Sequence, residues 1–168
     1  MALPNTGAIS FNMLNLQLHR PEMQQISLHD IQVRGLAGKT SGAIGLDDLR
    51  GKYAGAKLTA AQINSDIFGF RASPVPKGEF VGVFGGVSMQ QVAWARLNPT
   101  ISFLSLVTVT GADQPTATEI LVRGPNFEPL LQQPINSWSP SSGSWEAFVQ
   151  LPPDTPNLFP IGSTRWIS

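Results

Sequence analysis

The chain has 168 residues and a mass of 18.1 kDa, which is enough for one ordinary domain or for one domain with a small appendage. Hydrophobic residues make up 42% of it and charged residues only 13%, and the 11 basic and 11 acidic side chains leave no net charge to attract nucleic acid or an anionic membrane. There is no cysteine, and the longest apolar runs fall far short of the roughly 20 residues that span a bilayer. We therefore expect no nucleic-acid binding, no membrane insertion and no disulfide, and the N-terminal residues predict neither a secretion signal nor an anchor.

The neutral surface itself favours association. Proteins that remain monomeric usually keep their net charge away from zero, and this chain combines a zero net charge with few charged residues. We therefore expect partners to cover much of its surface, most simply as a symmetric homo-oligomer. The alternative is a neutral monomer whose polar surface consists of Ser, Thr, Asn and Gln.

A short phrase recurs three times in the first third of the chain. Its copies are centred on Ile9, Ile26 and Ile44, and in each copy the isoleucine precedes a small residue, with apolar residues following at helical offsets. This pattern is typical of a helix N-terminus, so the copies predict three short helices. Ser10 and Ser27 are the expected N-caps, because a serine hydroxyl accepts a hydrogen bond from an unpaired N–H group of the first turn. Each isoleucine is the expected staple residue before its cap.

The predicted helices are too short to be stable alone. Apolar stripes follow the first two caps, at Phe11, Leu14 and Leu18 and at Leu28, Ile31 and Leu36. Since isolated helices of fewer than about 12 residues are marginal in water, these helices must pack either on a partner protein or on the chain's own C-terminal domain. In the first case the docking contacts come from residues around the three caps, namely Ile9, Ser10, Phe11, Ile26, Ser27, Leu28, Ile44 and Leu46.

The character of the sequence changes near Lys57. Residues 1–57 hold 10 of the 22 charged residues although they are only a third of the chain, and most prolines lie beyond them. We expect residues 1–57 to form a short-helix docking segment and residues 58–168 to form an antiparallel, jelly-roll-like β-sandwich, so that the chain is α+β and mainly β. Alternating apolar patterns predict strands over 79–84, 87–97, 101–109, 116–123, 145–151 and 164–167.

Two segments of the β-rich part carry more specific information. Residues 101–109 are apolar at both alternating sets of positions, which predicts a strand covered on both faces. Residues 129–140 are rich in proline, which cannot donate a hydrogen bond to a β-ladder. This second segment is therefore predicted to be an ordered loop or an edge strand.

No catalytic constellation stands out in the sequence. His19 and His29 are ten residues apart without a metal-binding spacing, and residues 86–90 and 82–86 fail to match a serine nucleophile elbow and a phosphate-binding loop, respectively. We therefore expect no metal, no cofactor and no enzymatic activity. The open alternative is a glycosidase, which needs only two carboxylates flanking a groove. Its candidate carboxylates, among which the spacing selects no pair, are Asp66, Glu79, Asp113, Glu119, Glu128, Glu146 and Asp154.

Tryptophan is a second source of candidate contacts, because it is enriched at interaction hot spots. Trp94, Trp145 and Trp166 lie inside predicted strands and are expected in the core or between subunits. Trp138 lies between two serines in the proline-rich segment. We expect it to be accessible and to contact a ligand or partner.

Three segments, residues 6–10, 25–38 and 41–52, match a phrase of the type G-x-I-S that continues with hydrophobic, polar and acidic residues. The second copy keeps only the Ile-Ser pair, and the third has Gly45 where the pattern has serine. In this they resemble a family of small bacteriophage tail and virion structural proteins, over about a third of the chain. The resemblance implies a virion tail location, with an N-terminal segment that docks onto a tail, baseplate or fibre scaffold beside other tail proteins. It implies symmetric copies, with a trimer as the first expectation, and no catalysis.

Two alternatives to a tail component remain open at this stage. A capsid decoration or neck protein would use the same docking chemistry elsewhere in a virion. A carbohydrate-binding or host-receptor module would instead stack an exposed aromatic such as Trp138 on a host surface glycan.

Overall fold

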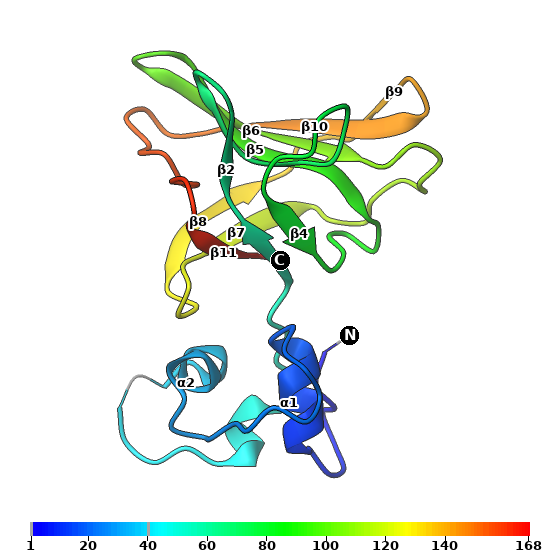
Figure 1. Cartoon of the computed structure of the whole chain (residues 1–168). Helices are drawn as coiled ribbons and strands as arrows, with labels where there is room; N and C mark the ends of the chain where they lie inside the picture. Colours follow the sequence, from blue (N-terminus) through cyan, green and yellow to red (C-terminus); the bar gives the residue numbers. More distant parts are fainter. Residues whose placement is uncertain (1, 40) are drawn as a thin grey trace.

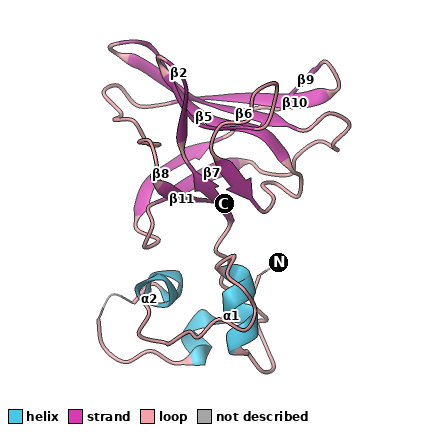
Figure 2. Cartoon of the chain, in the orientation of Figure 1, coloured by secondary structure: helices cyan, strands magenta, loops and turns pink. Residues whose placement is uncertain are grey.

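The computed structural model describes residues 2–39 and 41–168, which form a small N-terminal lobe and a larger β-sandwich (Figure 1). The N-terminal lobe comprises residues 2–39 and 41–55 and contains the helices, whereas the β-lobe comprises residues 56–168 and contains the strands (Figure 2). The predicted α+β, mainly β class with an antiparallel sandwich is confirmed.

Three short helical elements lie in the N-terminal lobe: α1 (Phe11–Gln17), α2 (Ile31–Ala37) and the 3₁₀ helix η1 (Leu46–Leu49). The first predicted cap is confirmed, because the Ser10 hydroxyl accepts a hydrogen bond from the Met13 N–H at 3.3 Å. The second is wrong: α2 is capped by the Asp30 carboxylate, and Ser27 instead accepts from a backbone N–H one turn earlier, at His29. A carboxylate three residues after the expected cap competed successfully for the helix start.

The β-lobe consists of two antiparallel sheets. The five-stranded sheet has the order β4-β1-β11-β7-β8, with bounds β4 (Glu79–Val81), β1 (Ala56–Thr59), β11 (Thr164–Ile167), β7 (Glu119–Arg123) and β8 (Pro129–Pro134). The six-stranded sheet has the order β2-β3-β5-β6-β10-β9, with bounds β2 (Ala61–Asn64), β3 (Ile67–Arg71), β5 (Met89–Asn98), β6 (Ile101–Thr108), β10 (Ser144–Gln150) and β9 (Ser139–Ser141).

Every strand predicted from alternation has a counterpart, and β11 has the predicted bounds. The proline-rich segment supplies β8 at the edge of its sheet, as its missing donors require. Strands β1, β2 and β3 were not predicted, because alanine supplies one of the two apolar positions in both β1 and β2, and Gly69 interrupts β3. The expectation that residues 101–109 lie between two covering layers is wrong, because only one face of β6 packs in the sandwich.

Two hydrophobic clusters stabilise the fold. The larger one fills the space between the sheets and includes Leu104 and Leu106 of β6 together with Ile120 and Val122 of β7. The smaller one fills the N-terminal lobe, where Leu14, Leu18, Val33 and Leu49 are fully or almost fully buried, and it includes Phe127 and Trp166 from the β-lobe. The helices therefore pack on the chain's own β-lobe, which is the second of the two packing alternatives above.

Candidate functional site

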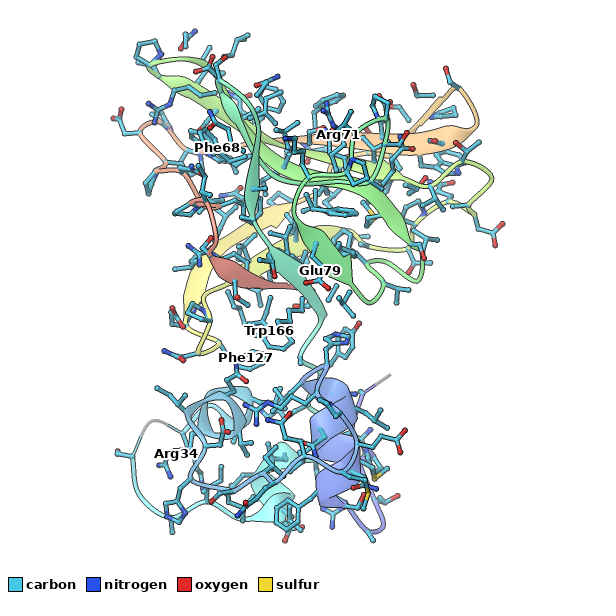
Figure 3. The ribbon with its side chains drawn as sticks, in the orientation of Figure 1. Arg34, Phe68, Arg71, Glu79, Phe127 and Trp166 are labelled. Atoms are coloured by element: carbon cyan, nitrogen blue, oxygen red, sulfur yellow. The ribbon has the colours of Figure 1, made fainter. Side chains whose placement is uncertain are left out.

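Trp166 joins the two lobes. Its ring is fully buried and lies between the His19 ring, 6.0 Å away at an interplanar angle of 17°, and the Phe127 ring, 4.5 Å away at 21°. Figure 3 shows Trp166 and Phe127 at the boundary between the lobes. The Nε2 atom of His19, the ring at one end of the stack, lies 3.0 Å from the carbonyl oxygen of Gly55. An aromatic stack of this kind fixes one lobe against the other.

The predicted docking residues mostly face inward. Ile9 is buried in the N-terminal cluster, and the side chains of Ile26, Leu28, Ile44 and Leu46 are half-buried against it. These five side chains therefore build the lobe and are turned toward its core. Of the remaining predicted docking residues, Ser10, Phe11 and Ser27 lie at the surface.

Other apolar side chains cover the outside of the N-terminal lobe. Leu16 is 54% exposed, Met23 is 86% exposed and Ile31 is 61% exposed, and Phe11 and Met13 are also exposed. The Asn12 side chain contacts the Met23 sulfur at 3.9 Å, so the loop after α1 folds back beside that helix. Met13, Leu16 and Met23 belong to no predicted docking set. Met13 and Leu16 are the apolar residues of α1 outside the predicted stripe, and Met23 lies in the loop after that helix. An apolar residue outside the stripe is the sequence signal that identifies them.

Polar contacts hold the outer shell of this lobe. Arg20 binds Asp30 through two hydrogen bonds, at 2.9 and 3.2 Å, and the hydrogen bond from Arg20 lowers the pKa of Asp30 below its usual value of 3.8. The buried Asn15 amide donates to two carbonyl oxygens of the loop after α1. All ion pairs found among residues 2–39 and 41–168 lie in this lobe.

Trp138 does not occupy the accessible position expected from its serine neighbours. Its ring is half-buried against the sandwich core and packs at a 51° tilt against Phe84, with 6.4 Å between the ring centroids. The indole N–H donates a hydrogen bond to the Ala117 carbonyl oxygen at 2.9 Å. The flanking serines are polar, but the ring packs on the core and its N–H is paired, so Trp138 contributes to packing.

The outer face of the six-stranded sheet is the largest departure from the sequence predictions. Register pairing places alternate residues of β3, β5, β6 and β10 in three rows across this face. The first row is polar at both ends and contains Arg71, Gln91, Val107 and Glu146. Neighbouring strands are about 4.8 Å apart, so the ends of this row are roughly 14 Å apart between Cα atoms. None of the ion pairs found among the described residues joins Arg71 and Glu146.

The other two rows give the face its shape. The middle row runs Gly69, Ala93, Ser105, Phe148, so its first three residues are small and its last is a large aromatic residue. Apolar residues dominate the third row, which runs Ile67, Ala95, Phe103, Gln150. The small side chains lie below the level of their neighbours and leave a hollow of about 430 Å³. Such a volume lies within the range of about 300–1,000 Å³ that small-ligand sites occupy.

Two aromatic rings form one wall of this hollow. Phe148 is 64% exposed, and it meets Phe103 edge to face at a centroid distance of 5.7 Å and an angle of 68°. A shallower and more open depression lies beside the same two rings, where Ile101 and Gln150 complete its lining. The aromatic pair therefore borders two adjacent depressions.

Polar groups in the first hollow are positioned in advance. The Gln91 amide N–H donates to the Ser105 hydroxyl at 2.8 Å, which fixes both side chains. A β-bulge between Met89 and Gln91 brings Gln90 to the same lining. The Arg71 Nε is buried without a hydrogen-bond partner. Within the described chain, Glu146 is the single carboxylate among the lining residues, so the paired carboxylates of a glycosidase do not come together here.

Neither a metal centre nor a membrane span is found in the described residues. No group of three or more His, Cys, Asp or Glu side chains lies close enough to hold a metal ion. None of the described helices has the length and apolar character that crossing a membrane requires.

No protein-family model matches the chain, and comparisons with curated proteins and with solved structures find no significant match.

Proposed function

We propose that this protein is a structural component of a bacteriophage tail, such as a tail fibre, baseplate or tail-adaptor protein, and that it is attached through its N-terminal lobe. The proposal combines the thrice-repeated N-terminal phrase with the two-ended architecture of the chain. It assigns no catalytic step to the protein.

The two-ended architecture is the observation that carries the proposal. The N-terminal lobe packs on the five-stranded sheet through Trp166 of β11 and Phe127 of the β7–β8 turn. The outer face of the six-stranded sheet is consequently turned away from that lobe, and Arg71 lies at the opposite end of the molecule from Arg34 (Figure 3). A chain built this way can attach at one end while it presents a surface at the other.

The attachment surface follows from burial. Because most residues of the repeated phrase are turned inward, a scaffold protein would contact the exposed apolar side chains of the same lobe, Leu16 and Met23 among them. Burial of an exposed leucine or methionine contributes roughly 1.5–3 kcal/mol, so a few such residues suffice for stable incorporation. Their exposure, together with the few charges on the chain, agrees with assembly into a homo-oligomer, for which a trimer is our first expectation.

Location in the virion is the decisive test. Immunogold electron microscopy of virions from the source of the chain, with antibody against residues 58–168, should place label at the tail. Label on the head would favour the capsid decoration or neck alternative, and particles without label would overturn the proposal.

A variant pair tests the attachment surface. Replacing both Leu16 and Met23 by Glu should leave the chain folded, since both side chains are largely exposed, and should abolish its incorporation into particles. Ile161→Glu, which alters an equally exposed residue of the β-lobe, is the matched control and should be incorporated normally. Equal incorporation of both variants would exclude this face of the lobe as the attachment surface.

A further inference from the structure

We infer that the outer face of the six-stranded sheet binds a neutral oligosaccharide, with the Phe103–Phe148 pair as the stacking platform and Arg71, Gln91 and Glu146 as hydrogen-bonding partners. This inference concerns the β-lobe alone and does not rest on the proposed tail location. Trp138, the aromatic residue that the sequence had suggested for this role, is half-buried in the sandwich and has no part in it.

The apolar component of the site fits a sugar ring. A pyranose has one face of C–H groups, which packs on an aromatic ring, while its hydroxyl groups project from the rim. Phe148 is 64% exposed at the edge of a hollow floored by the small side chains of Ala95 and Ser105. Its edge-to-face contact with Phe103 holds the ring in place, so stacking costs little side-chain entropy.

The polar component complements hydroxyl groups, which both donate and accept hydrogen bonds. Arg71 supplies donors, Glu146 supplies an acceptor, and the amide of Gln91 supplies an acceptor oxygen while its N–H is fixed on Ser105. One cation and one anion line the hollow, so the site has no net charge to select a polyanion. This balance favours a neutral glycan over a nucleic acid or an acidic polysaccharide.

The two adjacent hollows indicate the length of the ligand. They share Phe103 and Phe148. A single sugar would occupy one hollow, whereas a chain of two or more sugars would pass over the aromatic pair and use both. A flat protein partner fits less well, because specific protein interfaces bury about 800 Å² on each side through complementary surfaces, and this face is hollowed.

Binding is tested with the full chain and a defined panel of neutral oligosaccharides. Isothermal titration calorimetry with cellohexaose, maltohexaose, xylohexaose, mannohexaose and chitohexaose, each up to about 10 mM, should detect at least one ligand. Phe148→Ala should weaken that ligand at least tenfold, and Arg71→Met and Glu146→Gln should each weaken it about three- to tenfold. Ile161→Ala, which removes an apolar side chain of nearly equal exposure outside the hollow, should leave binding unchanged.

Three results would overturn the inference. One is the absence of heat with every member of the panel, and another is binding that survives all three substitutions in the hollow. The third is a wild-type oligomer, measured by analytical ultracentrifugation, that dissociates in Phe148→Ala, since this result would assign the face to a second copy of the chain. Lost binding can be distinguished from lost folding, because Phe148 and Ile161 are mostly exposed and urea unfolding measures the stability of each variant. If calorimetry detects a sugar ligand but the immunogold experiment labels no virion, the sugar site is supported and the tail location is rejected.

Discussion

Removal of the Trp166 ring should uncouple the two lobes. Trp166→Ala empties a fully buried site between His19 and Phe127, and substitutions of this type cost about 3–5 kcal/mol. Part of this loss is the two ring contacts, which contribute about 0.5–1.5 kcal/mol each beyond the area they bury. We expect the free energy of unfolding to fall by about 4 kcal/mol, which for a chain of this size lowers Tm by about 8–16 °C.

The assay combines urea unfolding, followed by circular dichroism, with limited proteolysis. Cleavage within residues 2–55 should accelerate in Trp166→Ala, because the smaller hydrophobic cluster loses its β-lobe wall. Trp145→Ala is the matched control, since Trp145 is half-exposed on β10 and its removal should cost clearly less. If Trp166→Ala destabilises the chain no more than Trp145→Ala and leaves the cleavage rate unchanged, the N-terminal lobe is held by its own contacts and the reasoning is refuted.

Three further predictions concern the N-terminal lobe. Ser10→Ala should lower the free energy of unfolding by about 1 kcal/mol whereas Ser27→Ala should have little effect, and equal losses in urea unfolding would contradict the assignment of the caps. The hydrogen bond from Arg20 lowers the pKa of Asp30, so the ionised carboxylate stabilises the folded chain above about pH 4, and this contribution is lost as the pH falls through the folded-state pKa. The wild-type chain should therefore be more stable than Asp30→Asn at neutral pH, and this difference in the free energy of unfolding should vanish in acid. Gly35→Ala should cost about 1–3 kcal/mol, because a Cβ there would overlap a backbone carbonyl oxygen of the β7–β8 turn, and an unchanged Tm would exclude that close approach.

Local patterns were sufficient for much of the fold. The serine before Phe11 identified the start of α1, and alternation placed β6 and β11, because caps and strand periodicity depend on neighbouring residues alone. Local patterns failed where two candidates competed, as at α2, where Asp30 rather than Ser27 caps the helix. They also failed at β1 to β3, where alanine or glycine occupies positions that a clear strand pattern fills with larger apolar residues.

Burial was the main quantity that the sequence misjudged. The apolar residues of the repeated phrase have the composition of either a docking surface or a small core, and only their packing around Trp166 identifies the core. The same ambiguity affected residues 101–109, whose two apolar faces predicted two covering layers. One of those faces packs in the sandwich, and the other forms the open floor and wall of the hollow.

By itself the sequence determined the class of fold, the capped start of the first helix and a surface with little charge, because composition and short-range periodicity control these properties. The tertiary structure alone decided the candidate binding face. Arg71, Gln91, Val107 and Glu146 are 75 residues apart from first to last, and they share one row because antiparallel register pairs four strands side by side. Alternation specifies that successive side chains point to opposite faces of a strand, but only the pairing of strands determines which side chains meet.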